Sequence, residues 1–268
     1  MNVANARFRH VTSADNPQFK QLKKIAGSGR ERRKLEQTLL DGVHLLDALA
    51  HVGGQLSLIA LREGAEAVPE IAQCVARFAA TPKIVLNAAL FNTLSPVEHP
   101  TGVLGLFAIP RPARHRHGCC VLLENIQDPG NLGSILRTAA GAGADAVYLS
   151  KGCAEAWSPK ALRAGMGAHF SLAIHEQHDL MSAMEQFNTV FAASLHASPT
   201  LYQADLKGNV AFLFGNEGGG LSPALSAAAT HQITIPMSGN IESLNVAAAV
   251  AICLFERVRQ LQRGIKPV

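Results

Sequence analysis

Short apolar runs alternate with amphipathic stretches in the first hundred residues, and this pattern predicts a small α/β unit. An amphipathic stretch at 18–28 follows Asn16-Pro17, which is typical of a helix start. A second helix is predicted over about 30–50, where leucines and a valine recur at helical spacing. A third helical stretch covers 68–80. Strands are predicted for the apolar runs 56–61, 83–87 and 102–109.

From residue 119 onward the pattern becomes that of a parallel α/β sheet. The run CCVLLE at 119–124 predicts a buried strand. A turn, a helix over 132–143 and a strand at 146–150 complete one βαβ unit. The last helix is predicted from about Leu244 to Arg263. Further strands are predicted at 171–175, 189–194, 210–215 and 231–236.

The stretch AIPRPARHRHG at 108–118 separates these two patterns. It holds two prolines and a glycine and has no apolar periodicity after Ile109, so it is typical of a linker. The predicted organisation is a smaller α/β domain at 1–110, a linker at 111–118 and a larger parallel-sheet α/β domain at 119–268.

Charge divides the chain in the same way. Residues 1–118 hold 15 Lys or Arg and 9 Asp or Glu, a net charge of +6, whereas 119–268 hold 9 and 11, a net charge of −2. The basic half is therefore expected to face a polyanion. A solvated helix face is the usual reason for a run of basic residues, and phosphate contact is the functional alternative. The crowded basic residues, with only Glu31 among them, are Lys20, Lys23, Lys24, Arg30, Arg32, Arg33 and Lys34.

The five cysteines have neither the spacing of a zinc site nor that of a disulfide framework. Their number is odd, no C-x-x-C occurs, and Cys119 and Cys120 are adjacent. Reduced, mostly buried thiols are expected. The first 18 residues hold no apolar stretch that could serve as a secretory h-region, so a cytoplasmic location is expected. We expect no metal site, because only His115 and His117 cluster, and they lie in the linker. No apolar run has the length of a membrane span, so no membrane partner is expected.

Three predicted strands each run into a turn rich in Gly, Pro, Asn or Ser and then into a helix. The first turn leads to Asn131 and Arg137, and the second, GNEGGGLSP at 215–223, contains Glu217. The third leads through Ser243 and Asn245 into the last helix. Ligands of open α/β sheets bind at the carboxyl ends of strands, so these turns are expected to converge on one crevice.

Each of these residues also has an ordinary structural explanation. Arg137 would be a surface arginine whose stem covers apolar neighbours, and Glu217 would be a solvated acid in a glycine-rich loop. Ser243 would be the N-cap of the last helix, with Asn245 in its first turn. Neither a P-loop nor a dinucleotide-binding G-x-G-x-x-G occurs in the required context, which argues against an NAD-dependent enzyme.

Taken together, the three turns resemble the motifs of the SpoU/TrmH-type RNA 2′-O-ribose methyltransferases of the SPOUT superfamily. The matching pieces are N-x5-R after a strand, then FGNEGGGLS, then IPM-x-G-x3-SLN, in this order. The N-terminal half resembles the ribosomal-protein-like α/β substrate-binding domain that many members carry. There, Asp41-Gly42 stands where Glu-Gly is commoner.

The resemblance implies a C-terminal domain with a deep trefoil knot, a known exception to the rule that chains are unknotted. It also implies a homodimer and S-adenosylmethionine as cofactor. The glycines would let the backbone wrap closely around this cofactor. Its contacts would involve Gly215, Ile235 and Leu244.

The resemblance also assigns catalytic roles. Arg137 would be the central residue, acting either as general base or as a clamp on the 3′-phosphate and the developing alkoxide. The second role is favoured, because a guanidinium with a pKa above about 12 is a poor base. Asn131, Ser243 and Asn245 would orient Arg137 and the ribose, and Glu217 would hold the loop or the active-site residues.

The expected substrate is RNA bound through the basic N-terminal segment, with ribosomal RNA favoured over transfer RNA. A transfer RNA 2′-O-methyltransferase is one alternative, and a non-catalytic RNA-binding protein that keeps the fold is another. The second alternative is disfavoured because Asn131, Arg137, Glu217, Ser243 and Asn245 are all present.

Overall fold

The computed structural model describes residues 8–95, 100–112, 118–195, 197–216, 218–238 and 243–262. By their contacts, the residues form two compact units, Met1–Arg111 with Trp157–Phe170 and Pro112–Ala156 with Ser171–Val268. The change of unit at residue 111 falls at the start of the predicted linker. Residues 157–170 depart from the predicted boundaries, because they group with the first unit. Within it, the Thr38 hydroxyl donates to the Trp157 carbonyl at 2.8 Å.

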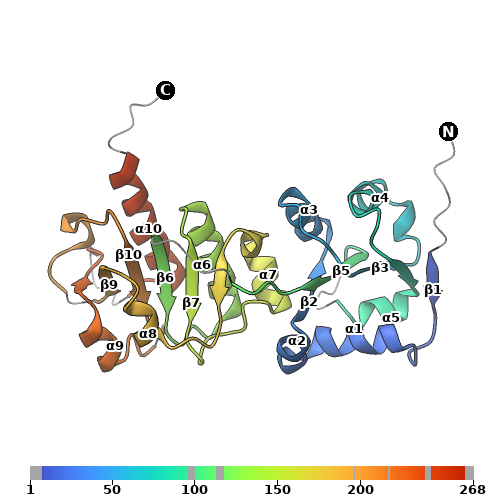
Figure 1. Cartoon of the computed structure of the whole chain (residues 1–268), viewed down its shortest axis with the longest axis horizontal. Coiled ribbons are helices and arrows are strands. Elements are labelled where there is room, and N and C mark those ends of the chain that lie inside the picture. Colours follow the sequence, from blue (N-terminus) through green and yellow to red (C-terminus); the bar gives the residue numbers. More distant parts are fainter. Residues whose placement is uncertain are drawn as a thin grey trace. The chain divides into compact units, whose positions relative to one another are not determined.

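The first unit is built on a mixed five-stranded sheet in the order β1-β4-β3-β5-β2 (Figure 1). The strands β1, β4 and β3 are parallel, whereas β5 runs antiparallel to both β3 and β2. Their bounds are β1 Arg9–Val11, β2 Gln37–Asp41, β3 Leu58–Arg62, β4 Lys83–Leu86 and β5 Val103–Ala108.

Helices cover both faces of this sheet (Figure 1). The apolar side of α1 packs with α5 against alternate strand residues such as Leu39, Ala60 and Leu86. The helices α3 and α4 pack on each other at the opposite face. The helical elements of this unit are α1 Pro17–Gly27, α2 Gly29–Leu35, α3 Val43–His51, η1 Ala65–Ala67, α4 Pro69–Ala76, α5 Ala88–Asn92, α7 Pro159–Gly165 and η2 Ala168–Phe170.

The single helix predicted over 30–50 is wrong, because strand β2 lies in the middle of it. Glu36 adopts a left-handed conformation with φ of 48° and ends α2. Gly42, with φ of 96°, then starts α3. The buried leucines of β2 happen to fall at helical spacing with those of α3, so apolar periodicity alone gave a continuous helix.

The second unit contains a six-stranded sheet, and every pairing in it is parallel. The order is β11-β9-β10-β6-β7-β8. The central strands are buried along their whole length, as is usual when helices cover both faces. The bounds are β6 Cys119–Leu123, β7 Ala146–Leu149, β8 Ala173–His175, β9 Thr189–Ala193, β10 Val210–Phe214 and β11 His231–Ile233.

Two pairs of helices sandwich this sheet (Figure 1). On one face, Leu180 and Ala183 of α8 and Leu225 of α9 pack against alternate residues of the central strands. On the other face, α6 and α10 pack against each other, and α10 also contacts β10. The helical elements are α6 Pro129–Gly141, α8 Leu180–Met184, η3 Leu201–Gln203, α9 Pro223–Ala228 and α10 Val246–Gln262. The predicted parallel α/β architecture is confirmed.

The strand order reverses between β6 and β10. From β6 the chain moves outward through β7 to β8, and it then crosses to the other side of the sheet to form β9, β10 and β11. The carboxyl ends of β6 and β10 therefore lie side by side at a topological switch point, where ligands of open α/β sheets bind. Within the described ranges, no helix has both the length and the apolar character needed to cross a membrane.

Candidate active site at the carboxyl ends of β6 and β10

Helix α6 begins directly after the first of these strand ends. Asp128 is its N-cap, with its carboxylate accepting from the backbone N–H of Asn131 at 2.7 Å. Pro129 occupies the first helical position, where its missing N–H is not needed. The cap fixes Asn131 in the first turn of α6, half-buried beside the switch point.

Asn131 and Asn245 meet across 114 positions of sequence: the Asn245 amide donates to the Asn131 side-chain oxygen at 3.1 Å. The other end of the Asn245 amide accepts from the backbone N–H groups of Ala247 and Ala248, at 2.9 and 3.4 Å. Asn245 thus caps α10, which starts at Val246. The expectation that Ser243 is the cap is wrong, since the helix begins two residues later than predicted.

Arg137 lies on α6 but points away from its buried side. The buried residues of α6 include Leu132, Ile135, Leu136 and Ala139, whereas Arg137 is exposed. No hydrogen bond or ion pair holds its guanidinium within the part of the chain that the structure describes. Its five N–H donors are therefore available to an incoming anion.

The glycine-rich turn after β10 is a tight loop closed by its own backbone. Asn216 N–H donates to the Gly220 carbonyl at 3.1 Å, and Gly220 N–H donates back to the Asn216 carbonyl at 2.8 Å. The Asn216 side chain also accepts from the N–H groups of Gly218 and Gly219, at 2.8 and 3.2 Å. Glu217 lies outside the described residues.

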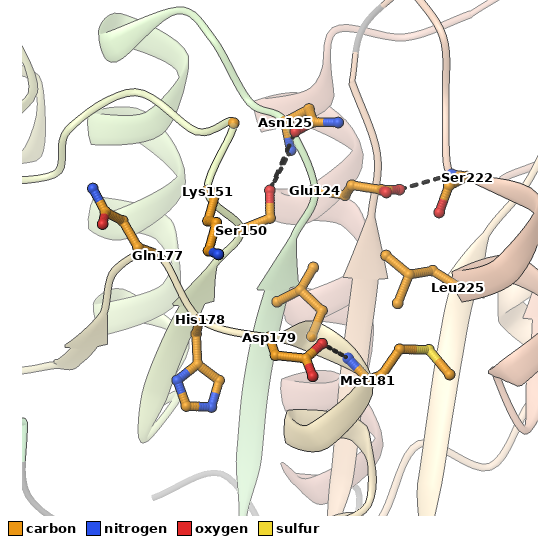
Figure 2. A pocket seen from close by; sticks show the side chains of 12 residues that line it. Glu124, Asn125, Ser150, Lys151, Gln177, His178, Asp179, Met181, Ser222 and Leu225 are labelled. Atoms are coloured by element: carbon orange, nitrogen blue, oxygen red, sulfur yellow. Dashed lines mark hydrogen bonds between the residues drawn. The ribbon is translucent and has the colours of Figure 1, made fainter.

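Gly215 is required by close approach within this loop. A Cβ at this position would overlap the carbonyl group of Gly220 and the backbone nitrogen of Leu221. The loop is also tied to the end of β6: the Asn216 amide donates to the Asn125 carbonyl at 2.8 Å. Glu124 adds a second tie by accepting from Ser222 N–H at 2.7 Å (Figure 2). The sequence motif predicted the glycines but not these anchors.

The remaining predicted cofactor residues lie on segments beside the loop. Ile235, just after β11, is half-buried, and Ser243 and Leu244, just before α10, are exposed. The residues between these two segments, 239–242, lie outside the described ranges. The segment after β11 is held to the chain that follows β9, because the Thr234 carbonyl accepts from Leu201 N–H at 2.8 Å.

Most of the basic residues predicted to bind RNA lie on the solvent faces of α1 and α2. The exposed ones are Lys20, Lys23, Lys24, Arg30, Arg33 and Lys34. Arg32 is different: it is only 6% exposed, and its guanidinium donates to the carbonyls of Ile25 and Ala26 at 2.7 and 3.1 Å. It caps the carboxyl end of α1, where a cation complements the helix dipole, and so has a structural role.

The described residues show no cluster of three His, Cys, Asp or Glu side chains that could hold a metal ion. The cysteines are unpaired, and all but Cys153 are buried. Burial raises the pKa of the Cys120 and Cys253 thiols to about 12. These thiols are therefore protonated at neutral pH and are packing groups rather than nucleophiles.

Comparison with known proteins places this geometry in a family. Residues 118–255 match the sequence model of the SpoU rRNA Methylase family. An uncharacterised tRNA/rRNA methyltransferase of Synechocystis is 35% identical over 260 residues, covering 93% of this chain and 93% of that protein. The 23S rRNA (guanosine(2553)-2′-O)-methyltransferase RlmP of Bacillus subtilis is 28% identical, covering 92% of this chain and 98% of its own.

A solved structure agrees in fold over nearly the whole chain. The AdoMet-bound rRNA methyltransferase of Sinorhizobium meliloti superposes with a TM-score of 0.80 at 28% identity, covering 97% of this chain and 99% of its own. The family match spans β6 to α10, the segment that carries Asn131, Arg137, the glycine-rich loop and Asn245. The chain therefore belongs to the SpoU rRNA Methylase family.

Proposed function

We propose that this protein transfers a methyl group from S-adenosylmethionine to a ribose 2′-hydroxyl of RNA, with ribosomal RNA as the substrate. The observation that carries the proposal is the hydrogen bond between Asn131 and Asn245, at 3.1 Å. It joins the first and third sequence motifs at the strand edge where the second motif forms its loop. Chance similarity in three separate motifs would not bring them to one place.

The fold provides a suitable place for the cofactor beside the glycine-rich loop. Gly215 leaves room for backbone to lie close to backbone, and the neighbouring segments expose Leu244, Met237 and Leu195 at 37%, 36% and 51%. Apolar side chains next to backbone polar groups suit a ligand with an aromatic base and a charged amino-acid end. Gly215, Ile235 and Leu244 would hold it, and when bound it supplies an electrophilic methyl group.

The protein's side chains position the ribose and stabilise the 2′-oxygen as this oxygen loses its proton. Arg137 is a clamp for the phosphate next to the 2′-hydroxyl and for the developing negative charge, because its N–H donors are exposed and unengaged among the described residues. Asn131 and Asn245 fix each other's amides at the edge of this site. Ser243 and Glu217 complete the proposed set, with Glu217 holding the loop or the other catalytic residues.

The proposed RNA contact surface is the exposed basic face of α1 and α2, without Arg32. On α1, Lys20, Lys23 and Lys24 recur three and four residues apart, opposite the buried Phe19 and Leu22. The positive charge of Lys20 is partly neutralised by Asp15, whose carboxylate lies 2.8 Å from the Lys20 ammonium nitrogen. The other exposed basic residues of this face therefore contribute most of its unneutralised positive charge. Phosphate contact by such a surface is independent of sequence, which fits a domain that delivers RNA to a separate catalytic edge.

Three further features are proposed from family membership. The C-terminal domain contains the trefoil knot, and two copies of the chain form a homodimer that works in the cytoplasm. Support for an interface comes from α10, where Phe255 and Leu261 are 50% and 43% exposed although the helix also packs on α6 and β10. Large exposed apolar side chains on a packed helix are common at subunit contacts.

Ribosomal RNA is favoured over transfer RNA because the relative from Bacillus subtilis that matches nearly end to end is named for 23S rRNA. Transfer RNA stays open, since the Synechocystis relative is named for both. A non-catalytic RNA-binding protein is the remaining alternative. Such a protein would bind RNA through the same basic surface, and its RNA binding would not require the Asn131–Asn245 hydrogen bond.

The deciding experiment supplies methyl-labelled S-adenosylmethionine with ribosomal or transfer RNA in separate reactions. Label is expected in ribosomal RNA and not with Arg137→Ala protein. Label in transfer RNA alone would select the first alternative. Cofactor binding without label in naked RNA or in ribosomal subunits would select the non-catalytic one.

A further inference from the structure

We propose that a second pocket, on the α8 and α9 side of the sheet, receives a nucleotide of the RNA next to the methylated one. This inference rests on the proposed function. The pocket has a volume of about 570 Å³ and opens at the carboxyl ends of β6 and β7 (Figure 2). That volume lies in the range of small-ligand sites. None of the residues assigned above to catalysis or to cofactor binding lines it.

The floor of the pocket is apolar and its rim is polar, which suits the face and the edge of a nucleobase. Leu180 and Leu225 are buried at 3% and 7% exposure, while Met181 beside them is 44% exposed. His178 stands at the rim with its ring tilted at 59° to that of Tyr148, 5.1 Å between centroids. An imidazole held in this way offers a stacking surface to an unstacked base.

Charge at the rim discriminates between the parts of a nucleotide. Lys151 is exposed and is the cation among the lining residues, so it suits a phosphate. Both Asp179 oxygens are used inside α8, by Met181 N–H and by the Ser182 hydroxyl. One Glu124 oxygen is held by Ser222 N–H at 2.7 Å (Figure 2). The second oxygen of Glu124 suits the N–H donors on a base edge rather than a phosphate.

Backbone strain marks the same rim. Asn125 and Gln177, both lining the pocket, adopt left-handed conformations with φ of 56° and 53°. Among the described residues the other non-glycine positions with positive φ are Glu36 and Met166, and both of these end helices. Asn125 and Gln177 end no helix, and strained non-glycine residues away from helix ends gather at ligand sites.

The pocket adjoins the proposed catalytic edge through Asn125. Its carbonyl accepts from Asn216 of the glycine-rich loop at 2.8 Å, and its N–H bonds to Ser150 on the pocket side at 3.0 Å. Four residues after Asn125, helix α6 begins and carries Asn131. Asn125 therefore lies between the pocket and the glycine-rich loop, six residues before Asn131, which is why we assign a neighbouring nucleotide to the pocket.

Photocross-linking tests this assignment without requiring catalysis. The probe is ribosomal RNA transcribed with 4-thiouridine, bound to the full-length protein and irradiated, and cross-linked peptides are then identified. Cross-links are expected within 177–181, and Lys151→Ala and His178→Ala are each expected to weaken RNA binding several-fold to tenfold. Lys207→Ala is the matched control, because Lys207 is an exposed cation that precedes β10, whereas the pocket opens at the carboxyl ends of the strands.

Three results would overturn the assignment. The first is cross-links that avoid 177–181 together with unchanged RNA binding by both variants. The second is a parallel loss of S-adenosylmethionine binding, which would make the pocket part of the cofactor site. The third is a pocket that binds free nucleoside monophosphates through Lys151 and His178, while substitution of these two residues leaves RNA binding unchanged. The pocket would then be a site for a free nucleotide and not for RNA. Cross-links in 177–181 without any methyl transfer would uphold the pocket and reject the proposed function.

Discussion

At the scale of single residues, the site depends on polar groups that are fixed by helix caps. Asn131 owes its position to the Asp128 cap, and Asn245 is itself a cap: its side-chain oxygen accepts from the helix N–H groups, and its side-chain NH2 group donates to Asn131. The positions at which α6 and α10 begin therefore determine where Asn131 and Asn245 lie in the site. Because the Asn245 amide is engaged at both ends, a flip of this amide breaks three hydrogen bonds, and one of them is the bond to Asn131.

Gly215 provides the sharpest test at this scale. Gly215→Ala places a methyl group against the Gly220 carbonyl, so the loop must move, at a cost of about 1–3 kcal/mol in folding free energy. We expect S-adenosylmethionine binding, measured by calorimetry, to weaken at least tenfold. Gly219→Ala is the control, since nothing lies within 4 Å of its Cβ position. Equal affinities for the two variants would mean that the loop does not shape the cofactor site.

The sequence predicted the motif residues but could not predict how they are held. The pattern SLN placed Ser243 and Asn245 near a helix start, yet which of them caps α10 depends on where the chain enters the helix. The role of Asn125 had no signal, because a single asparagine after a strand is common. Arg32 was counted with its basic neighbours, since a repeating charge pattern does not reveal that one side chain folds back onto the preceding helix.

At the scale of elements, long periodic segments were predictable and short or interrupted ones were not. The strands of the second sheet and helices α6 and α10 coincide with their predictions to within a few residues. The short helices α7, α8 and α9 were missed, although Ser158-Pro159 and Ser222-Pro223 are readable helix starts. Helices of five to seven residues carry too few apolar positions to show a period.

Helix α2 allows a test of the proposed RNA surface. The double variant Arg33→Glu, Lys34→Glu reverses two exposed charges without touching the Arg32 cap. We expect weaker binding to ribosomal RNA and a salt dependence of log K that is less steep by about 1–2, since two phosphate contacts are lost. The measurement is RNA affinity at several salt concentrations.

Arg77→Glu is the control for that variant. Arg77 is exposed at the end of α4, on the sheet face opposite α1. Arg77→Glu changes the net charge by −2, half of the −4 of the α2 variant. If it changed affinity and salt dependence half as much as the α2 variant does, net charge and not the face of α1 and α2 would govern RNA binding.

At the scale of the whole molecule, sheet order decides where the chemistry lies. Alternating strands and helices predicted a parallel sheet, but not that the chain crosses from β8 to β9 on the far side of β6 and β10. Which strand neighbours which depends on contacts between distant segments, and these leave no periodic trace in the sequence. The crossing creates the switch point and brings the first and third motifs together.

The buried thiols make stability depend on pH above neutrality. Burial raises the pKa of the Cys253 thiol from 9.0 to about 12, so the folded protein keeps it neutral where the unfolded chain ionises it. The stabilisation is complete below pH 9 and is lost as the pH rises from 9 toward 12. The unfolding free energies of wild type and Cys253→Ala should converge by about 1.4 kcal/mol per pH unit there. Urea titrations that stay parallel from pH 8 to 10.5 would refute this.

The proposed reaction delivers the methyl group to a ribose oxygen under the control of Arg137. The most direct measurement digests RNA from a wild-type reaction to nucleosides and identifies the labelled product, with Arg137→Ala and Arg137→Lys run beside it. We predict a 2′-O-methylnucleoside and a linkage resistant to alkali. Loss of Arg137 should lower kcat by about 10²–10³-fold, as removal of a charge-stabilising donor does, with cofactor affinity unchanged. A methylated base would contradict transfer to the ribose, and full activity without Arg137 would contradict its role as the clamp.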